Sequence, residues 1–316
     1  MGLFAVLCVP LLVGAPLFAC EEHAYVRAIL DPLPEPLLGM RVEVHKTMGP
    51  QVVIANPTEL SVEVLDENGT PFVRIGPSGV EGNLAAKAWY ETYSPGAVAP
   101  ATADVGAQPQ WTHAATEPSF GWFEPRLDAK QVLLPPEVIT MGHATDLGRW
   151  WLPLRVDGEP IELTGIFRYE PPPKGMFVAR MTTPAQVAPG VRVRLLPGLA
   201  AGFLVQNSSG SALHVLGMDG EPFLRIGPEG VDANLSSRTW WASARASGRR
   251  PAAAEGRTSL PDWQRVAAAP RFSWIDPRAQ APRGQGYLDS ISWRIPIRLD
   301  AQLLAVTGET AWETRR

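Results

Sequence analysis

The chain has 316 residues, of which 45% are hydrophobic and 19% charged, with 32 Pro and 29 Gly. This hydrophobic content can bury a core and excludes a wholly disordered chain, while the length is that of about two domains of ~150 residues. The formal net charge is −4, and the absence of a dense basic cluster argues against a nucleic-acid partner.

Residues 1–20 are typical of a secretory leader. The segment 3–19 is apolar or small, and Pro10 and Pro16 would interrupt a membrane-spanning helix. A signal peptide needs only about 7–15 apolar residues before a small-residue cleavage site. The leader ends in Leu17-Phe-Ala-Cys20, which resembles the lipobox of bacterial lipoproteins. We therefore expect lipid attachment at this cysteine, with a plain secreted leader and an uncleaved anchor as alternatives.

Both cysteines, Cys8 and Cys20, lie in the leader. Residues 21–316 therefore contain no disulfide, no Cys nucleophile and no CxxC metal site. The expected location is extracytoplasmic, with a lipid holding the protein to a membrane. Without the lipid, the protein would be periplasmic or secreted.

The strongest feature of the sequence is an internal repeat. With a shift of 151 residues, 24–93 align with 175–244 without a gap, and fifteen of forty positions are identical in the best-matched stretch. Shifts of 152 and 143 align the later segments. We therefore predict two copies of one fold, residues 24–173 and 174–316, joined through three consecutive prolines.

Each copy contains short segments that alternate between polar and apolar residues, which is the pattern of a half-buried strand. Asn68-Gly69 and Asp219-Gly220 predict hairpin turns between two of these segments, because such residues tolerate positive φ. The predicted strands of the first copy are 41–45, 51–55, 60–65, 70–75, 149–156 and 161–169. Those of the second copy include 192–195, 202–206, about 290–298 and 301–312.

No long segment has the helical period of 3.6 residues. Short helical turns are predicted near 81–88 and 127–132, and a long loop over 91–118. About seven strands per copy indicate an all-β protein made of two tandem antiparallel immunoglobulin-like β-sandwich domains.

Two motifs occur in both copies. The first reads DGEPFLRIGPEGV at 219–231. The second reads Trp122-Phe-Glu-Pro-Arg126 and then Trp274-Ile-Asp-Pro-Arg278. Together they resemble motifs of an uncharacterised group of bacterial secreted or membrane-anchored β-rich proteins. The resemblance implies an extracytoplasmic β-rich domain and no particular chemistry. Members of that group often carry His before the final Arg, where this chain has Pro.

The charged members of these motifs have two interpretations. A carboxylate and a guanidinium beside an indole could line a polar pocket, or they could form an internal ion pair. Their recurrence in both copies favours the structural role. We expect Arg74 and Arg225, which lie in predicted strands, to pair with the acid of the second motif. The other candidate residues are Trp122, Glu124 and Arg126 in the first copy, and Trp274, Asp276 and Arg278 in the second.

Four pairs of Trp residues occupy matching positions and are predicted to anchor the two cores. Trp151 has no matching Trp and is predicted to be exposed. The pairs are 89/240, 111/263, 122/274 and 150/293.

These patterns favour a non-catalytic binding or structural protein of the cell envelope, whose partners are a membrane and an unidentified envelope protein. No cofactor-binding motif is present. A copper-handling protein is the first alternative, because thioether and imidazole ligands suit copper. An enzyme of unknown class is the second, although GxSxG, HExxH, GxGxxG and P-loop motifs are absent. The candidate copper ligands are Met48, His113, Met141 and His143.

Overall fold

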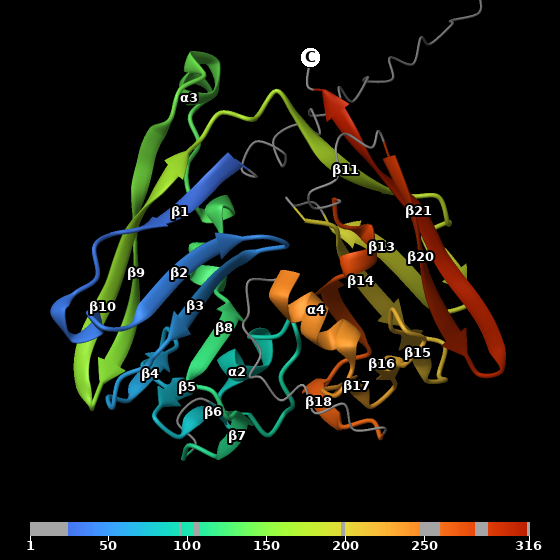
Figure 1. Cartoon of the computed structure of the whole chain (residues 1–316), viewed down its shortest axis with the longest axis horizontal. Helices are drawn as coiled ribbons and strands as arrows, with labels where there is room; N and C mark the ends of the chain where they lie inside the picture. Colours follow the sequence, from blue (N-terminus) through green and yellow to red (C-terminus); the bar gives the residue numbers. More distant parts are fainter. Residues whose placement is uncertain are drawn as a thin grey trace, which may run out of the picture.

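The computed structural model describes residues 25–94, 96–103, 108–196, 200–246, 260–281 and 290–314. In these residues the fold is all-β, which confirms the predicted class, and every pairing of strands is antiparallel (Figure 1). There are two seven-stranded sheets, one four-stranded sheet and one three-stranded sheet. The N-terminal half contains one large and one small sheet, and so does the C-terminal half.

The large sheet of the N-terminal half has the strand order β1-β10-β9-β4-β5-β6-β7, and the small sheet has the order β2-β3-β8. Three 3₁₀ turns and two short α-helices lie between these strands. The strands are β1 Val26–Leu30, β2 Arg41–Lys46, β3 Pro50–Ala55, β4 Val62–Leu65, β5 Pro71–Gly76, β6 Gly79–Asn83, β7 Trp111–Ala115, β8 Ser119–Phe123, β9 Thr145–Val156 and β10 Glu159–Tyr169. The helices are η2 Glu35–Leu37, α2 Lys87–Glu91, η3 Pro125–Leu127, η4 Ala129–Gln131 and α3 Pro136–Met141.

The C-terminal half has a large sheet of corresponding order, β11-β21-β20-β15-β16-β17-β18, and a small sheet of order β12-β13-β14-β19. Its one additional strand, β12, lies at the edge of the small sheet. The strands are β11 Gly175–Met181, β12 Gln186–Ala188, β13 Val191–Leu196, β14 Gly202–Asn207, β15 Leu213–Leu216, β16 Pro222–Gly227, β17 Gly230–Asn234, β18 Trp263–Ala267, β19 Arg271–Ile275, β20 Ser290–Leu299 and β21 Gln302–Thr314. The helices are α4 Arg238–Ala246 and η5 Pro277–Ala279.

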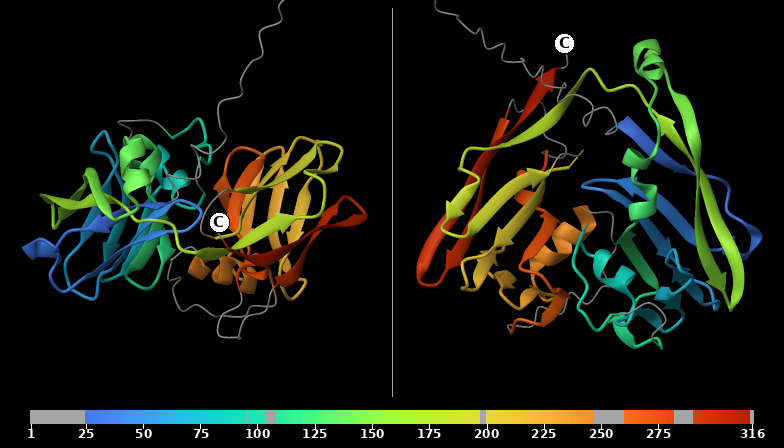
Figure 2. Two further views of the ribbon diagram at one scale, coloured as in Figure 1. Left: turned by 90° about the horizontal axis from the view of Figure 1, so that it is seen from above. Right: turned by 180° about the vertical axis from the view of Figure 1, so that it is seen from behind.

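In each half the small sheet packs on the large one and encloses a core. In the N-terminal half, Ile54 and Trp122 of the small sheet join Val64 and Leu154 of the large sheet in one buried cluster. Because strand side chains alternate between two faces, the opposite face of each large sheet points outward. The arrangement is sandwich-like in both halves (Figure 2).

The matched Trp residues anchor these cores, as predicted for three of the four pairs. The rings of the 89/240, 122/274 and 150/293 pairs are buried. The fourth pair, Trp111 and Trp263, is only half-buried, at the outer edge strand of each large sheet. Trp151 is 62% exposed, which confirms the prediction for the unmatched residue.

Two matched glycines allow the Trp rings on β9 and β20 to lie against the neighbouring strand. A Cβ on Gly165 would lie 2.3 Å from the Trp150 ring and 2.1 Å from the Ile29 carbonyl oxygen. A Cβ on Gly308 would meet the Trp293 ring at 2.2 Å in the same way. Glycine is required here because any side chain would displace a ring that fills the core.

The two halves are joined by more than the chain connection between β10 and β11 (Figure 1). The segment after α2 lies against the C-terminal half: the hydroxyls of Ser94 and Ser273 are 2.7 Å apart, and the amide of Ala268 donates to the Val98 carbonyl. The Tyr93 ring lies 5.9 Å from Trp240. The contact is therefore both polar and apolar.

The sequence underestimated the number of strands and missed the helices α3 and α4. About seven strands per copy were expected, whereas the described residues hold ten in one half and eleven in the other. The predicted loop over 91–118 contains β7, and a helical turn near 81–88 is divided between β6 and α2. The turns predicted at 127–132 are confirmed by η3 and η4. The helices α3 and α4 have no counterpart in the prediction.

Substituting Gly165 tests the packing of the Trp150 ring. We expect Gly165→Ala to lower the free energy of unfolding by about 1–3 kcal/mol, because the added methyl overpacks a filled core. Gly148→Ala is the matched control on the same sheet, since a Cβ there meets nothing within 4 Å. Chemical denaturation of both variants measures the difference. Equal stability of the two variants would contradict the packing described.

Candidate functional site

The second repeated motif forms a buried brace in each half. In the C-terminal half, Asp276 follows β19 and is fully buried. Its Oδ2 accepts from the Trp274 indole Nε1 at 3.0 Å and from Arg278 Nη2 at 2.8 Å. Its Oδ1 accepts from the Arg278 backbone amide at 3.1 Å and from Arg278 Nε at 2.8 Å. Each carboxylate oxygen therefore accepts two hydrogen bonds.

The N-terminal half repeats this geometry with a longer acid. Glu124 is 2% exposed and accepts from Trp122 Nε1 at 3.0 Å. Arg126 donates to the same carboxylate from Nε and Nη2, both at 2.7 Å, and from its backbone amide at 3.2 Å. This two-pronged pairing is the strong form of an arginine–carboxylate interaction.

Each brace also ties the small sheet to the large one. Arg126 Nη1 donates to the carbonyl oxygen of Leu65, at the end of β4, at 2.9 Å. Arg278 Nη1 donates to Leu216, at the end of β15, at 3.1 Å. The proline between acid and arginine begins a 3₁₀ turn, and the acid caps that turn. The three candidate residues of this motif therefore come together in each half, and the hydrogen bonds described for them are made within the protein.

The pairing predicted for Arg74 and Arg225 is wrong. Neither reaches the buried acid, because each side chain points to the outer face of its large sheet. Arg74 instead pairs with Glu63 at 2.9 Å and Glu81 at 3.1 Å, on the strands to either side. Its guanidinium also lies 4.1 Å from the centre of the Trp111 ring. The arginine braces neighbouring strands across the sheet face instead of joining the two layers.

This outer face carries a row of five residues that are paired across the strands of each large sheet. In the N-terminal half two arginines alternate with two glutamates, and a histidine ends the row. The row is Arg155, Glu63, Arg74, Glu81 and His113. The corresponding row of the C-terminal half is Arg298, His214, Arg225, Asp232 and Arg265, which has three cations and one carboxylate.

Asp232 is shared by two arginines of the second row. Arg225 Nη2 lies 2.9 Å from its carboxylate and Arg265 Nε lies 2.5 Å from it. These hydrogen bonds and charges lower the pKa of Asp232, although burial opposes them. The Trp263 ring lies 4.9 Å below the Arg225 guanidinium, in the place that Trp111 has in the other half.

His214 stands where the N-terminal row has Glu63. Burial, and then the charges of Arg298 and Arg225, lower the pKa of His214 from its ordinary value of 6.5. The folded state consequently binds this proton more weakly than the unfolded state does. The contribution of His214 to the stability of the fold is therefore fully present above about pH 6.5 and is lost as the pH falls through the lowered pKa.

Two pairs of asparagines, at matching positions in the two halves, have a structural role that was not predicted from the sequence. Asn56 and Asn207 each donate from Nδ2 to two backbone carbonyls, and in this way secure the loop before β4 or β15. Asn83 and Asn234, at the ends of β6 and β17, each donate from Nδ2 to one backbone carbonyl and accept a backbone amide at Oδ1. Their identity in both copies was the available signal.

The structure does not bring the candidate copper ligands together. His113 lies on β7, whereas Met141 and His143 lie at α3, at the opposite end of the N-terminal half (Figure 1). Met48 lies at the tip of the β2–β3 hairpin, against Gly202. Over the described residues, no group of three or more His, Cys, Asp or Glu side chains is arranged to hold a metal ion.

Cys20 and the leader lie outside the described residues. Within the described part of the chain, no helix has the length and apolar character needed to cross a membrane. No family model matches the sequence, and neither the curated proteins nor the solved structures contain a significant match. The resemblance noted from the two motifs therefore stays a prediction.

Neutralising the buried acid tests the brace. We expect Asp276→Asn to lower the free energy of unfolding by about 3–5 kcal/mol, because it leaves the mostly buried Arg278 charge without its counter-ion. Asp262→Asn, at an exposed position, is the control and should stay within about 0.5 kcal/mol of the natural chain. Chemical denaturation gives both values. A loss below about 1 kcal/mol at Asp276 would contradict the assigned role.

Exchanging Glu63 and His214, at one of the two positions where the rows differ, tests the electrostatics of the rows. We expect His214→Glu to raise the melting temperature at pH 7 by about 1–3 °C, because it places a carboxylate between two arginines. Its melting temperature should also fall less between pH 7 and pH 5. The reciprocal Glu63→His should be less stable than the natural chain. Melting followed by circular dichroism at both pH values measures this, and shifts of the opposite sign would refute it.

Proposed function

We propose that the chain is a non-catalytic protein of the cell envelope that presents a binding or assembly surface on two tandem immunoglobulin-like β-sandwich repeats. The observation that carries the proposal is that the polar groups of the second repeated motif bond to one another inside each half. Its acids and indoles are buried, its arginines are part-buried, and all of them are bonded to one another in both halves. Such a set stabilises a scaffold, and an acid that accepts four hydrogen bonds is poorly placed for proton transfer.

The two halves support an origin by internal duplication. Their large sheets have corresponding strand orders, and the same Gly–Trp contacts and buried braces occur in both. In a duplicated scaffold, the two copies can differ in function at their outer faces and at cavities that occur in one copy only. The binding role proposed here belongs to those places.

We further propose that a lipid on Cys20 holds the protein to the membrane. The lipobox-like end of the leader supports this attachment. Two acyl chains give stable anchoring, whereas a single chain gives only weak, reversible binding. The protein would then lie on the extracytoplasmic side of the membrane, and without the lipid it would be periplasmic or secreted.

Labelling with a radioactive fatty acid tests this proposal. We expect the full chain, expressed in bacteria, to incorporate the label and to enter the detergent phase of a phase separation. Cys8→Ala is the matched control in the leader and should also be labelled, whereas Cys20→Ala should not. An unlabelled natural chain, or equal labelling of Cys20→Ala, would show that the anchor is not a lipid on this residue.

A further inference from the structure

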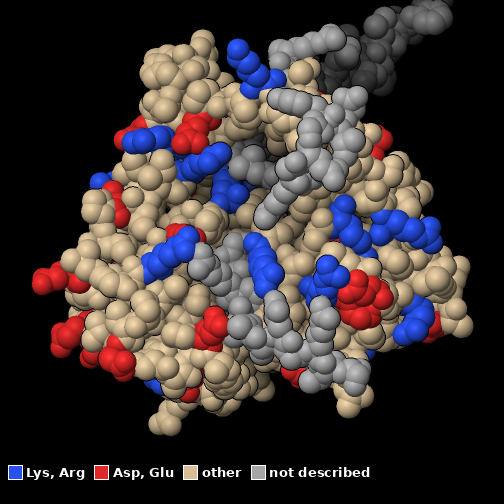
Figure 3. All heavy atoms as spheres, viewed as in Figure 1, with Lys and Arg blue, Asp and Glu red and all other residues tan. Residues whose placement is uncertain are grey.

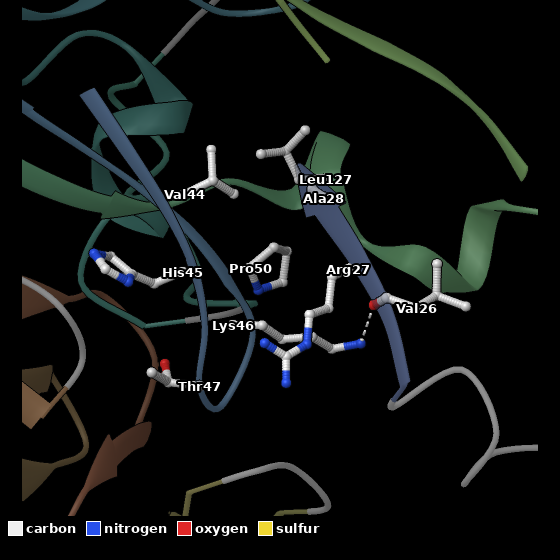
Figure 4. A pocket seen from close by; sticks show the side chains of 9 residues that line it. All are labelled: Val26, Arg27, Ala28, Val44, His45, Lys46, Thr47, Pro50 and Leu127. Atoms are coloured by element: carbon white, nitrogen blue, oxygen red, sulfur yellow. Dashed lines mark hydrogen bonds between the residues drawn. The ribbon is translucent and has the colours of Figure 1, made fainter. Parts of the chain in front are cut away.

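A cavity of about 220 Å³ opens in the N-terminal half between β1 and the β2–β3 hairpin. Figure 4 shows the nine side chains that line it. Val44, Ala28 and Leu127 lie at one end, and Arg27, Lys46 and Thr47 lie toward the other (Figure 4). The cavity therefore has an apolar end and a cationic end.

Lys46 is the central polar group of this cavity. It is the last residue of β2, and its Nζ donates to the Val26 carbonyl oxygen on β1 at 2.7 Å. Burial is the main cause that lowers its pKa to about 8. The charge of Asp128 opposes this effect, and those of Arg27 and Lys130 add to it. The ammonium is therefore still mostly protonated at pH 7, and an anion beside it would replace part of the solvation that burial removes.

The charges around the cavity leave a positive excess. Arg27, Lys46 and Lys130 are the cations, against the carboxylates of Asp128 and of Glu170, which pairs with Arg27 at 2.8 Å. The excess is about one charge. On the face shown in Figure 3, several Lys and Arg side chains lie to the upper left of centre, with Asp and Glu side chains beside them, over the region where β1 lies in Figure 1.

This cationic end is not duplicated. In the C-terminal half, the residue that corresponds to Arg27 is Val178, and the one that corresponds to Lys46 is Pro197. The braces, the Gly–Trp contacts and the asparagines that bond to loop backbone occur in both halves, as expected of groups that the fold requires. A cavity whose charged residues occur in one half only serves something other than the fold.

We propose that this cavity binds a small organic monocarboxylate, with its carboxylate at Lys46 and Arg27 and its short apolar body toward Val44 and Leu127. The volume is below the ~300–1,000 Å³ typical of drug-sized ligands, so the ligand is small. One excess positive charge matches a monoanion. The apolar end matches an aliphatic body better than it matches a free inorganic anion.

Protection of Lys46 from acetylation tests the proposal on the natural chain. The sequence has only four lysines, so peptide mass spectrometry can follow each of them, and Lys87 and Lys174, away from the cavity, serve as internal references. We expect hexanoate to slow the acetylation of Lys46 at least fivefold while leaving Lys87 and Lys174 unchanged. Hexylammonium, of equal length and opposite charge, should not protect. Equal rates with and without hexanoate would overturn the proposal. Protection by inorganic phosphate alone would overturn the assignment to an organic acid.

A variant gives the second measurement. We expect Lys46→Met to weaken hexanoate binding at least tenfold, measured by saturation-transfer NMR on the detergent-solubilised full chain. Lys87→Met, at an exposed position of α2, is the matched control. Unchanged binding by a Lys46→Met chain that melts like the natural one would refute the site, and if that variant does not fold, the protection experiment decides.

This inference deepens the binding role proposed above and is independent of the lipid anchor. A chain that carries no lipid but protects Lys46 would fail the anchor and keep the cavity. A lipid-labelled chain without protection would do the reverse.

Discussion

The rest of the structure depends on a buried carboxylate that accepts four hydrogen bonds. In each half the acid lies where the small sheet ends, and its arginine reaches back to the large sheet. A buried ion pair repays its desolvation only when the geometry is good and the remaining oxygens are satisfied. Here the indole and the backbone amide supply those remaining bonds. The brace thus fixes how the two layers meet, while the apolar core supplies most of the burial.

Comparison of the halves separates what the fold requires from what it permits. The braces, the asparagines that bond to loop backbone and the Gly–Trp contacts recur. Each of them either fills the core or satisfies buried backbone groups. The outer-face rows recur in position but not in sign, because His214 stands in place of Glu63 and Arg265 in place of His113. Arg27 and Lys46, the cations of the cavity, have uncharged counterparts in the sequence of the other half. Function is therefore best sought where the two halves differ, at the cationic cavity and at the more positive outer face.

Much of the fold could be read from the sequence, because alternation fixes which strand residues face the core. It placed β2–β5, β9 and β10 within a few residues and identified the buried Trp anchors. It could not give the partner of Arg74, since alternation assigns a face but not a neighbour, and the two glutamates lie on other strands. Helix α4 was missed because its Trp, Thr and Ser residues have weak helix propensity and tertiary packing holds it.

The cavity could not be predicted, because it depends on how β1 meets a hairpin that is separate in sequence. The members of the brace could be identified from the sequence, since the acid, arginine and indole lie within five residues and recur. Their burial could not be predicted, and burial decides between a polar pocket and an internal ion pair. The structure resolves that choice because both oxygens of each acid are bonded.

Hydrogen exchange of the Trp indoles tests the central claim most directly. NMR of the chain labelled with ¹⁵N-Trp follows the Nε1–H of Trp122 and Trp274, which donate to the buried acids. The exposed Trp151 serves as the reference. If the braces hold the layers together, the two buried indoles exchange only through global unfolding of their half. Exchange of Trp122 and Trp274 at a rate near that of Trp151 would contradict this account.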